Sequence, residues 1–520
     1  MHMKDFWDKY LCEDRRRKSS AASHREENKD YRNEYESDLS RVIFSSAARR
    51  MHDKTQVIPL TYDDNVHSRL THSLEVMTIG ESIVKGILME MGKKEYGDDK
   101  DKVLAYYNKY HNAISGLIRT VCLAHDIGNP PFGHFGETVI TDFFNKEFSQ
   151  GKCWDKYNEW KNDFTQYDGN AQGFRVLTKL QCLNDLFGLN CTYSSLASYL
   201  KYPNSGKGDK NSSRIECHKH GVFGADWEVA KEALEKTACL LREEEGETRY
   251  IRHPLSYVME AADSICYLSM DIEDAFQKGW VSVEDIFDTM QGGVIVPQED
   301  EDFWKKFFVI RDQNEGEKLS IKDRLETQGR DKIVHFRVGL IQYFSTLAID
   351  NFVANVDKIE SGKYNKELIK HDDKKVAKCL GKYSVKNIYS QKENMMLEMT
   401  GKSVISGLLR ILADVLFHSD GDFRKRGKSL ISASVLRANL MDFKLVSGDW
   451  YYDKDKKAYF KKDIEEGDEK LPIDIDKELD GFDVSNFPDY FKYRVIVDYV
   501  SGMTDKFAVS LYQELSGMAL

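Results

Sequence analysis

Two short segments of the 520-residue chain carry side chains that could hold a metal ion. Residues 69–75 read RLTHSLE and include His72, and residues 124–137 read AHDIGNPPFGHFGE and include the adjacent His125 and Asp126. The second segment follows an apolar stretch, which predicts a helix that delivers an imidazole and a carboxylate to one point. Mixed nitrogen and oxygen ligands of this kind suit divalent metals. Together the two segments predict a metal site for hydrolysing phosphate esters.

A third stretch offers another carboxylate on a separate helix. Residues 259–275 read MEAADSICYLSMDIEDA, in which Asp263, Tyr267 and Asp271 are four residues apart. Residues at this spacing share one face of a helix, so the three side chains can point into one cleft. The stripe predicts a pocket; the alternative is that Tyr267 belongs to the ordinary core.

Helices are expected to position these residues. The chain has only 8 prolines, and it contains several long amphipathic windows. The clearest windows are residues 73–91, 112–124 and 227–242. Polar and charged separators predict loops or insertions at residues 92–102, 203–214, 311–332, 361–375 and 447–472. Aromatic flanks around a polar turn predict a small β-hairpin near 450–460. We therefore predict an all-α fold.

Composition limits the class of protein. Apolar residues make up 41% of the chain and aromatic residues 12%, which argues against disorder, while 31% charged residues predict a well-solvated surface. No apolar run is long enough to span a bilayer, and no secretory signal is indicated. The 9 cysteines are odd in number and form no C-x-x-C pair, which favours reduced thiols and a cytoplasmic location.

The net charge of −11 means that the chain as a whole repels polyanions. A phosphate substrate must then be held by a local basic pocket or by a metal. The charge disfavours bulk nucleic-acid binding but leaves room for a local basic groove. The basic run Arg15–Lys18 is expected to lie in a mobile tail, and Arg49 and Arg50 in a solvated face or an internal ion-pair cluster.

His72, His125, Asp126 and Asp263, in this order, resemble the ligand set of the HD phosphohydrolase superfamily. The flanking sequence motifs resemble those of its bacterial deoxyguanosine triphosphate triphosphohydrolase (dGTPase) branch and span most of the chain. These motifs are RRM at 49–51, KTQV at 54–57, RLTHSLEV at 69–76, HDIGNPPFGHFGE at 125–137, GNAQGFR at 169–175, KYP at 201–203 and SGMTD at 501–505. Asp168 departs from the pattern, because glutamate is expected there.

The resemblance implies one divalent cation held by these four side chains. Two imidazoles and two carboxylates suit Mn²⁺, Mg²⁺ or Fe²⁺ better than a thiolate-preferring metal, and Mn²⁺ is the first expectation. The resemblance also implies attack of water on the α-phosphorus and departure of the 5′ oxygen of the sugar, which needs a proton. His134 and Glu137, one helical turn apart, are the expected catalytic pair. Which of the two handles the water stays open, and helix capping after Pro130–Pro131 is the alternative.

Substrate contacts are implied in the same way. Gln56 and Asp271 would hold the sugar 3′-hydroxyl, and Tyr267 would pack where the 2′-hydroxyl of a ribonucleotide would clash. Selectivity for deoxynucleotides would follow. The expected phosphate contacts are Arg69, Asn129, Asn170, Lys201 and Lys219.

We therefore predict a cytoplasmic hydrolase with a charged N-terminal tail at 1–30, an HD-type catalytic core at 31–280 and a helical C-terminal region at 281–520 that packs on the core. The predicted reaction converts dGTP and water into deoxyguanosine and inorganic triphosphate. The alternatives are a triphosphohydrolase of broader dNTP specificity, an HD-type nucleotidase or phosphodiesterase, and a regulatory protein that binds nucleotides or single-stranded DNA. The resemblance further implies a homo-oligomer, commonly a hexamer, with single-stranded DNA as a further partner and no membrane association.

Overall fold

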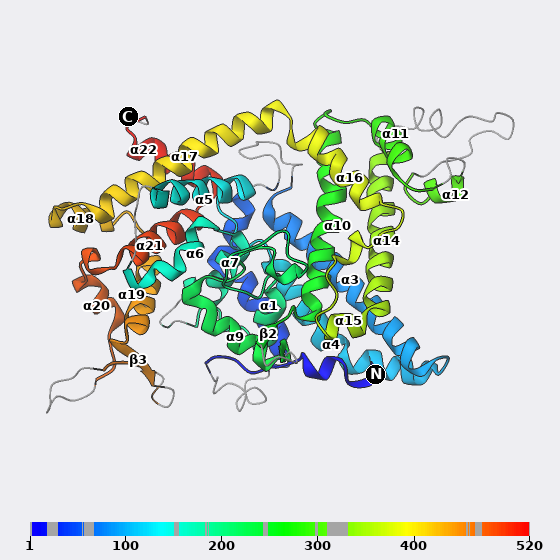
Figure 1. The fold of residues 1–520 in the computed structure, drawn as a ribbon, viewed down its shortest axis with the longest axis horizontal. Helices are drawn as coiled ribbons and strands as arrows, with labels where there is room; N and C mark the ends of the chain where they lie inside the picture. Colours follow the sequence, from blue (N-terminus) through cyan, green and yellow to red (C-terminus); the bar gives the residue numbers. More distant parts are fainter. Residues whose placement is uncertain are drawn as a thin grey trace.

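The computed structural model describes most of the chain, and the described part is built almost entirely of helices (Figure 1). The described residues are 3–17, 30–54, 56, 67–149, 155–181, 185, 187–242, 248–296, 300–308, 331–453, 456, 458–462 and 471–518. Within them, the strands form two antiparallel sheets of two strands each. The predicted all-α class is confirmed.

The helices differ widely in length, and short 3₁₀ and π turns connect several of them. The elements of the first half are α1 (Glu34–Ile43), α2 (Ser46–Arg50), α3 (Arg69–Tyr96), α4 (Lys100–Ala124), α5 (Gly133–Ser149), α6 (Asn162–Thr165), α7 (Gly169–Arg175), α8 (Tyr193–Tyr199), α9 (Trp227–Lys236), β1 (Leu240–Arg242), β2 (Thr248–Tyr250) and α10 (Pro254–Gln277). Those of the second half are α11 (Val283–Gly293), α12 (Glu301–Trp304), α14 (Asp331–Ala354), α15 (Val356–Glu360), α16 (Val376–Ser384), α17 (Lys392–Phe417), α18 (Gly421–Lys428), α19 (Ala433–Ser447), β3 (Trp450–Asp453), β4 (Ala458–Lys461), α20 (Ile475–Gly481), α21 (Asp489–Ser501) and α22 (Asp505–Leu515).

Helices α3, α4, α10 and α14 form a central group. α3 packs against the other three, and α10 and α14 stand side by side in Figure 1. Gly80 of α3 permits this close approach, because a Cβ at that position would lie 2.7 Å from Sγ of Cys122 in α4 and 3.7 Å from Cβ of Ala262 in α10. The three stretches with predicted metal ligands therefore lie on or beside neighbouring helices.

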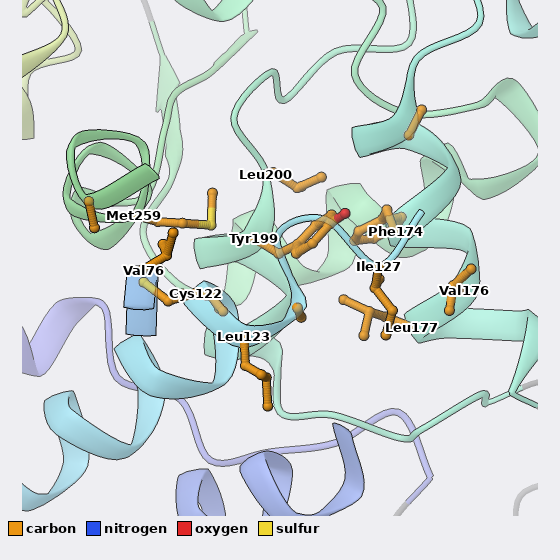
Figure 2. Packing of buried hydrophobic residues seen from close by; sticks show 14 of the residues in the cluster. Val76, Cys122, Leu123, Ile127, Phe174, Val176, Leu177, Tyr199, Leu200 and Met259 are labelled. Atoms are coloured by element: carbon orange, nitrogen blue, oxygen red, sulfur yellow. The ribbon is translucent and has the colours of Figure 1, made fainter. Parts of the chain in front are cut away.

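An apolar cluster fills the space where these helices meet (Figure 2). Val76 of α3, Cys122 of α4, Met259 of α10 and Tyr199 of α8 are each at most 1% exposed. The Tyr199 hydroxyl also donates a hydrogen bond to the backbone carbonyl of His125 over 3.4 Å. Close packing of this kind resists displacement of the side chains and of the backbone that carries them. The cluster therefore holds the helices with the predicted ligands in place.

A buried ion network joins the two halves of the chain. The fully buried Arg175, at the end of α7, lies 3.0 Å from a carboxylate oxygen of Asp498 in α21 and 3.0 Å from one of Asp442 in α19. The Nζ of Lys179 lies 2.7 Å from Asp442 and 2.7 Å from Asp226. Because each buried charge has an opposite partner, the network can exist in the core.

The predicted helices are present, although some of their ends differ. The windows at 73–91 and 112–124 lie inside α3 and α4, which are both longer than predicted. The predicted loop at 92–102 is therefore wrong for most of its length, because α3 continues until Gly97 turns the chain with a φ of +61°. The hairpin predicted near 450–460 is confirmed as the paired strands β3 and β4.

The window at 227–242 is only partly helical. Helix α9 ends at Lys236, and Ala238 has a φ of +51°, which a right-handed helix cannot accommodate. The next residues form β1, in which Leu240 pairs with Tyr250 of β2. The sequence did not predict this second small sheet.

The charged tail predicted at 1–30 is wrong for the residues that the structure describes there. Trp7 is fully buried, and Arg15 is only 8% exposed. The guanidinium of Arg15 donates to the buried carboxylate of Asp38 over 2.5 Å. Residues 18–29 lie outside the described residues.

Three further expectations concern the chain as a whole. The boundary between 31–280 and 281–520 stays a prediction, and α10 packs against α14 and α5 against α17 across it. Over the described residues, no helix is both long enough and apolar enough to cross a membrane. The cysteines in the same ranges are all free, as expected for reduced thiols.

The network around Arg175 allows a test of how the halves are joined. Arg175→Met keeps most of the side-chain volume but removes the arginine partner of Asp226, Asp442 and Asp498. We expect this change to lower the free energy of unfolding by about 3–5 kcal/mol. Urea denaturation followed by circular dichroism measures this change. The control Lys85→Met removes a half-buried surface pair with Glu81 on α3, and a helical pair of this kind is worth only about 0.3–0.5 kcal/mol. Equal midpoints for the two variants would contradict the assignment.

Candidate metal centre

Helix α3 begins just before His72. Ser68 caps the helix by accepting a hydrogen bond from the backbone N–H of Thr71, and the Thr71 hydroxyl accepts one from the backbone N–H of Ser68. This reciprocal cap fixes where the first turn starts. His72 is thereby carried inward, with 1% of its surface exposed.

His125 and Asp126 stand where α4 gives way to a loop. The Nδ1–H of His125 donates to the carbonyl of Cys122 over 2.7 Å. Burial opposes a charge on this ring, but Asp126 and Asp263 outweigh burial and raise the pKa of His125. When the ring loses its second proton, the bond from Nδ1–H leaves Nε2 unprotonated, and an unprotonated Nε2 is the form that binds metals. Nε2 of His125 is buried and has no hydrogen-bond partner among the described residues.

The structure brings the four predicted ligands together. Nε2 of His125 lies 3.5 Å from Oδ1 of Asp126 and 3.5 Å from Oδ1 of Asp263. Nε2 of His72 lies 3.3 Å from the same Asp263 oxygen. One ligand atom from each of His72, His125 and Asp126 falls within 4.8 Å of the others. Three distant stretches of the sequence thus meet at one point.

Three of the predicted phosphate contacts orient these carboxylates. Nδ2 of Asn129 donates to Oδ1 of Asp126 over 2.6 Å, and the Arg69 guanidinium donates to its Oδ2 over 2.6 Å. The Nζ of Lys201 donates to Oδ2 of Asp263 over 2.9 Å. Such outer contacts fix the direction in which a ligand oxygen points.

The charges of the group keep both carboxylates ionised. Burial by itself would raise the pKa of Asp126, but His125 and Arg69 outweigh burial and hold that pKa below its usual value. In the same way, Lys201 and His125 outweigh burial and hold the pKa of Asp263 well below its usual range. Ionised carboxylates are the form that binds a cation.

His134 and Glu137 lie in the first turns of α5. His134 is 79% exposed, and its Nδ1 lies 2.9 Å from Oε2 of Glu137. The Glu137 carboxylate raises the pKa of His134. The other oxygen of Glu137 accepts a hydrogen bond from the backbone N–H of Gly169 over 2.7 Å, so Glu137 also binds the N-terminus of α7. Glu137 therefore does have a capping contact, as the alternative predicted, but with α7 and not with α5, the helix to which it belongs.

Asn170 and Lys219 both contact Asp168. Asp168 caps α7, because its Oδ1 accepts hydrogen bonds from the backbone N–H of Asn170 over 2.9 Å and from Nδ2 of Asn170 over 2.8 Å. The Nζ of Lys219 donates to Oδ2 of Asp168 over 2.8 Å. Aspartate is a preferred capping residue. Asp168, which stands where the resemblance predicts glutamate, therefore stabilises the N-terminus of α7.

The side predicted to hold the sugar is built on α10. Asp271 is 4% exposed and accepts a hydrogen bond from the Tyr389 hydroxyl over 2.6 Å, while burial raises the pKa of Asp271 to about 7. Tyr267, one turn earlier, is half-buried. Gln56 is described, but its neighbours 55 and 57–66 lie outside the described residues. Its Oε1 is buried without a partner in the part of the chain that is described.

Comparisons with known proteins show the family to which the chain belongs. The model of the phosphohydrolase-associated domain matches residues 464–514. The chain is 31% identical over 525 residues to a deoxyguanosinetriphosphate triphosphohydrolase-like protein of Listeria monocytogenes, covering 99% of this chain and 100% of the relative. It is 30% identical over 515 residues to a deoxyguanosinetriphosphate triphosphohydrolase of Yersinia pseudotuberculosis, covering 92% of this chain and 93% of the relative. The chain belongs to this family of HD-domain phosphohydrolases. Membership confirms the resemblance seen in the sequence and makes the chain a hydrolase.

Dependence on a divalent metal is implied for this family, and the residues present fit such an ion. The donor set offers two imidazole nitrogens and two carboxylates, which together balance a divalent charge. The Nε2 of His125, which has no hydrogen-bond partner in the described part of the chain, lies 3.5 Å from an oxygen of each carboxylate. Asp126 is 14% exposed and Asp263 22% exposed at their side chains, so the group is open on one side.

Sequence reasoning missed two residues beside the site. His67 lies between carboxylates, with Nδ1 2.8 Å from Asp274 and Nε2 3.1 Å from Glu75. Burial opposes its charge, but the two carboxylates raise the pKa of His67 to about 10. Tyr389 was missed because it lies 118 residues from Asp271 in the sequence. His67 stands two residues before Arg69, which is the one local signal that could have pointed to it.

A cavity of about 760 Å³ lies behind the loop that carries Asp126. Its walls include Lys54, Ile127 and Gly128, together with Arg49 and Arg50, and none of the metal-binding candidates. Arg49 is exposed, as the sequence predicted for a solvated face. Arg50 is half-buried and donates to the hydroxyl of Ser46.

Titration with a metal tests the site directly. We expect the protein, once stripped with a chelator, to bind one Mn²⁺ per chain in isothermal titration calorimetry. Asn129→Ala should weaken binding about 10- to 100-fold, because loss of an outer contact has this effect, and His125→Ala should weaken it further. The exposed His52 provides the control His52→Ala, which should bind as tightly as the natural protein. Unchanged affinity in His125→Ala would rule out the site.

Proposed function

We propose that the chain hydrolyses dGTP to deoxyguanosine and inorganic triphosphate. Water adds to the α-phosphorus, the bond between that phosphorus and the 5′ oxygen of the sugar breaks, and a proton moves to the departing oxygen. The observation that carries the proposal is the meeting of His72, His125, Asp126 and Asp263. The names of the relatives support dGTP as the substrate.

A divalent cation bound to these four side chains would supply charge stabilisation for the phosphoryl group, and Mn²⁺ is our first choice over Mg²⁺ or Fe²⁺. Around it, the chain supplies positive groups for the triphosphate. Arg69 and Lys201 touch the ligand carboxylates, and Lys219 lies beyond Asp168. We propose that these three side chains, with Asn129 and Asn170, hold the phosphates in line for attack.

His134 is proposed as the acid that protonates the departing oxygen. Its exposure lets it reach a bound substrate, and Glu137 fixes the orientation of its ring. The raised pKa keeps the imidazole protonated closer to neutral pH. Because Glu137 is itself held by the N-terminus of α7, the pair is anchored to two helices.

The sugar is proposed to bind between α10 and Gln56. The carboxyl of Asp271 would accept the 3′-hydroxyl, with Tyr389 holding its other side. The buried Oε1 of Gln56, which has no hydrogen-bond partner among the residues that the structure describes, can take part. Tyr267, half-buried on the same face of α10, would exclude a 2′-hydroxyl and so favour deoxynucleotides.

Other features stay predictions from the family resemblance. They are a homo-oligomer, with a hexamer as its order, the binding of single-stranded DNA, and a cytoplasmic location. Broader dNTP specificity and an HD-type nucleotidase or phosphodiesterase stay as the alternatives for the reaction, and a regulatory nucleotide or DNA binder as the alternative for the class.

Product analysis tests the reaction. Each common deoxy- and ribonucleoside triphosphate is incubated with Mn²⁺-loaded protein, and the products are separated by ion-exchange chromatography. We expect dGTP to give deoxyguanosine and intact triphosphate, and ribonucleotides to react poorly. Asp126→Ala should abolish turnover without changing the helical circular dichroism, whereas the exposed Asp422→Ala on α18 should be fully active. Release of pyrophosphate or single phosphate would defeat the proposed reaction.

The pH profile tests the acid. If protonated His134 is required, activity falls as pH rises through its pKa. Glu137→Gln removes the charge that raises this pKa, so the alkaline fall in kcat should move to lower pH. His134→Ala should lower kcat about 100-fold or more. Asp142→Asn, which removes an exposed carboxylate from the same helix, should leave the profile in place. An alkaline limb that does not move in Glu137→Gln would exclude this role.

A further inference from the structure

The motif Ser501–Asp505 has no part in the proposed reaction, yet it lies against the loop that does. It spans the end of α21 and the start of α22. Thr504 caps α22 by accepting from the backbone N–H of Phe507. Asp505, the next residue, is only 2% exposed, so its carboxylate is buried among other parts of the chain.

Asp505 binds the backbone of the loop between Asp126 and α5. Its Oδ1 accepts a hydrogen bond from the backbone N–H of Phe132 over 3.0 Å. Phe132 has a φ of +61°, a left-handed conformation that residues with a side chain rarely adopt. A buried N–H needs an acceptor, and Asp505 supplies one at the most strained point of the loop.

Lys54 binds the same loop from another direction. Lys54 is 3% exposed, and its Nζ donates to the backbone carbonyl of Asn129 over 2.5 Å and to that of Ser501 over 2.8 Å. The backbone carbonyl of Lys54 also accepts from the N–H of Arg69 at the start of α3. One side chain therefore joins the loop to the C-terminal motif.

Helix α17 closes the arrangement from above. It crosses the top of the molecule in Figure 1 and packs against both α5 and α22. A Cβ at Gly401 of α17 would lie only 2.8 Å from the ring of Phe132, so glycine leaves room for that ring. The strained residue is thus held by its backbone and by its side chain.

We propose that Asp505 and Lys54 are positioning residues, which hold the loop 126–132 so that His134 faces the metal centre. The inference rests on the proposed function, because it assigns His134 as the acid. Neither residue touches the substrate. The loop begins at a metal ligand and ends at the helix that carries the acid, so its shape sets the distance between the two. A small displacement of a reacting group lowers the rate steeply.

Three variants at the motif test the proposal by steady-state kinetics. Asp505→Ala removes the acceptor, and we expect kcat to fall about 10- to 100-fold with KM for dGTP unchanged, because misplacement affects the chemical step. Asp505→Asn keeps an oxygen that can accept from Phe132 and should recover most of kcat. Thr504→Ala removes the cap of the same helix but leaves Asp505 in place, so it should keep the natural kcat.

Hydrogen–deuterium exchange provides a second readout that does not depend on hydrolysis. In Asp505→Ala, the peptides that cover residues 126–133 should exchange faster, while those of α10 stay as protected as before. Lys54→Met keeps the buried volume without the charge; it should also lower kcat and loosen the same loop, which provides a second variant if Asp505→Ala does not fold.

Natural kcat and unchanged exchange in both Asp505→Ala and Lys54→Met would overturn the proposal. A loss of kcat that Asp505→Asn fails to recover, with no faster exchange in the loop, would also overturn it. If the natural protein releases no triphosphate, the proposed function fails; the exchange data then still decide whether the two residues hold the loop.

Discussion

The buried imidazole of His125 constrains the geometry of the whole site. Its Nδ1–H is held by a carbonyl of the preceding turn, so Nε2 must face the carboxylates of Asp126 and Asp263, each 3.5 Å away. Two carboxylates this close together repel each other in a poorly solvated place. They are stable there because Arg69 and Lys201 approach from the outer side. The inner oxygens, which face His72 and His125, would be available to a divalent ion.

The rest of the fold serves to hold this group. Two glycines permit close approaches. A Cβ at Gly128 would lie 2.0 Å from the backbone nitrogen of Gly173, and a Cβ at Gly169 would lie 2.1 Å from Oδ1 of Asn129. Glycine is therefore required for α7 to reach the loop and to bind Glu137. Farther away, the network around Arg175 joins α7 to α19 and α21, so the second half of the chain supports the first.

The sequence determined much of the site, because its information is local. Helical spacing placed Asp263 and Asp271 on one helix, and the adjacent His125 and Asp126 at the end of another. The order of these residues and their flanking words identified the family, and the relatives confirmed it. The helical class and the hairpin near 450–460 followed from periodicity and turn residues, which depend only on near neighbours.

Only the tertiary structure decided which distant residues meet. Trp7 and Arg15 are buried although the first residues read as a charged tail. Trp7 stacks on Phe352 and Arg15 pairs with Asp38, and no local pattern reveals either partner. The contact between Asp505 and Phe132 joins residues 373 positions apart. Periodicity describes one element at a time, whereas such contacts depend on how all elements pack. The sequence alone therefore determined which residues could do the chemistry and on which elements they lie. Only the folded chain determined which distant residues contact them.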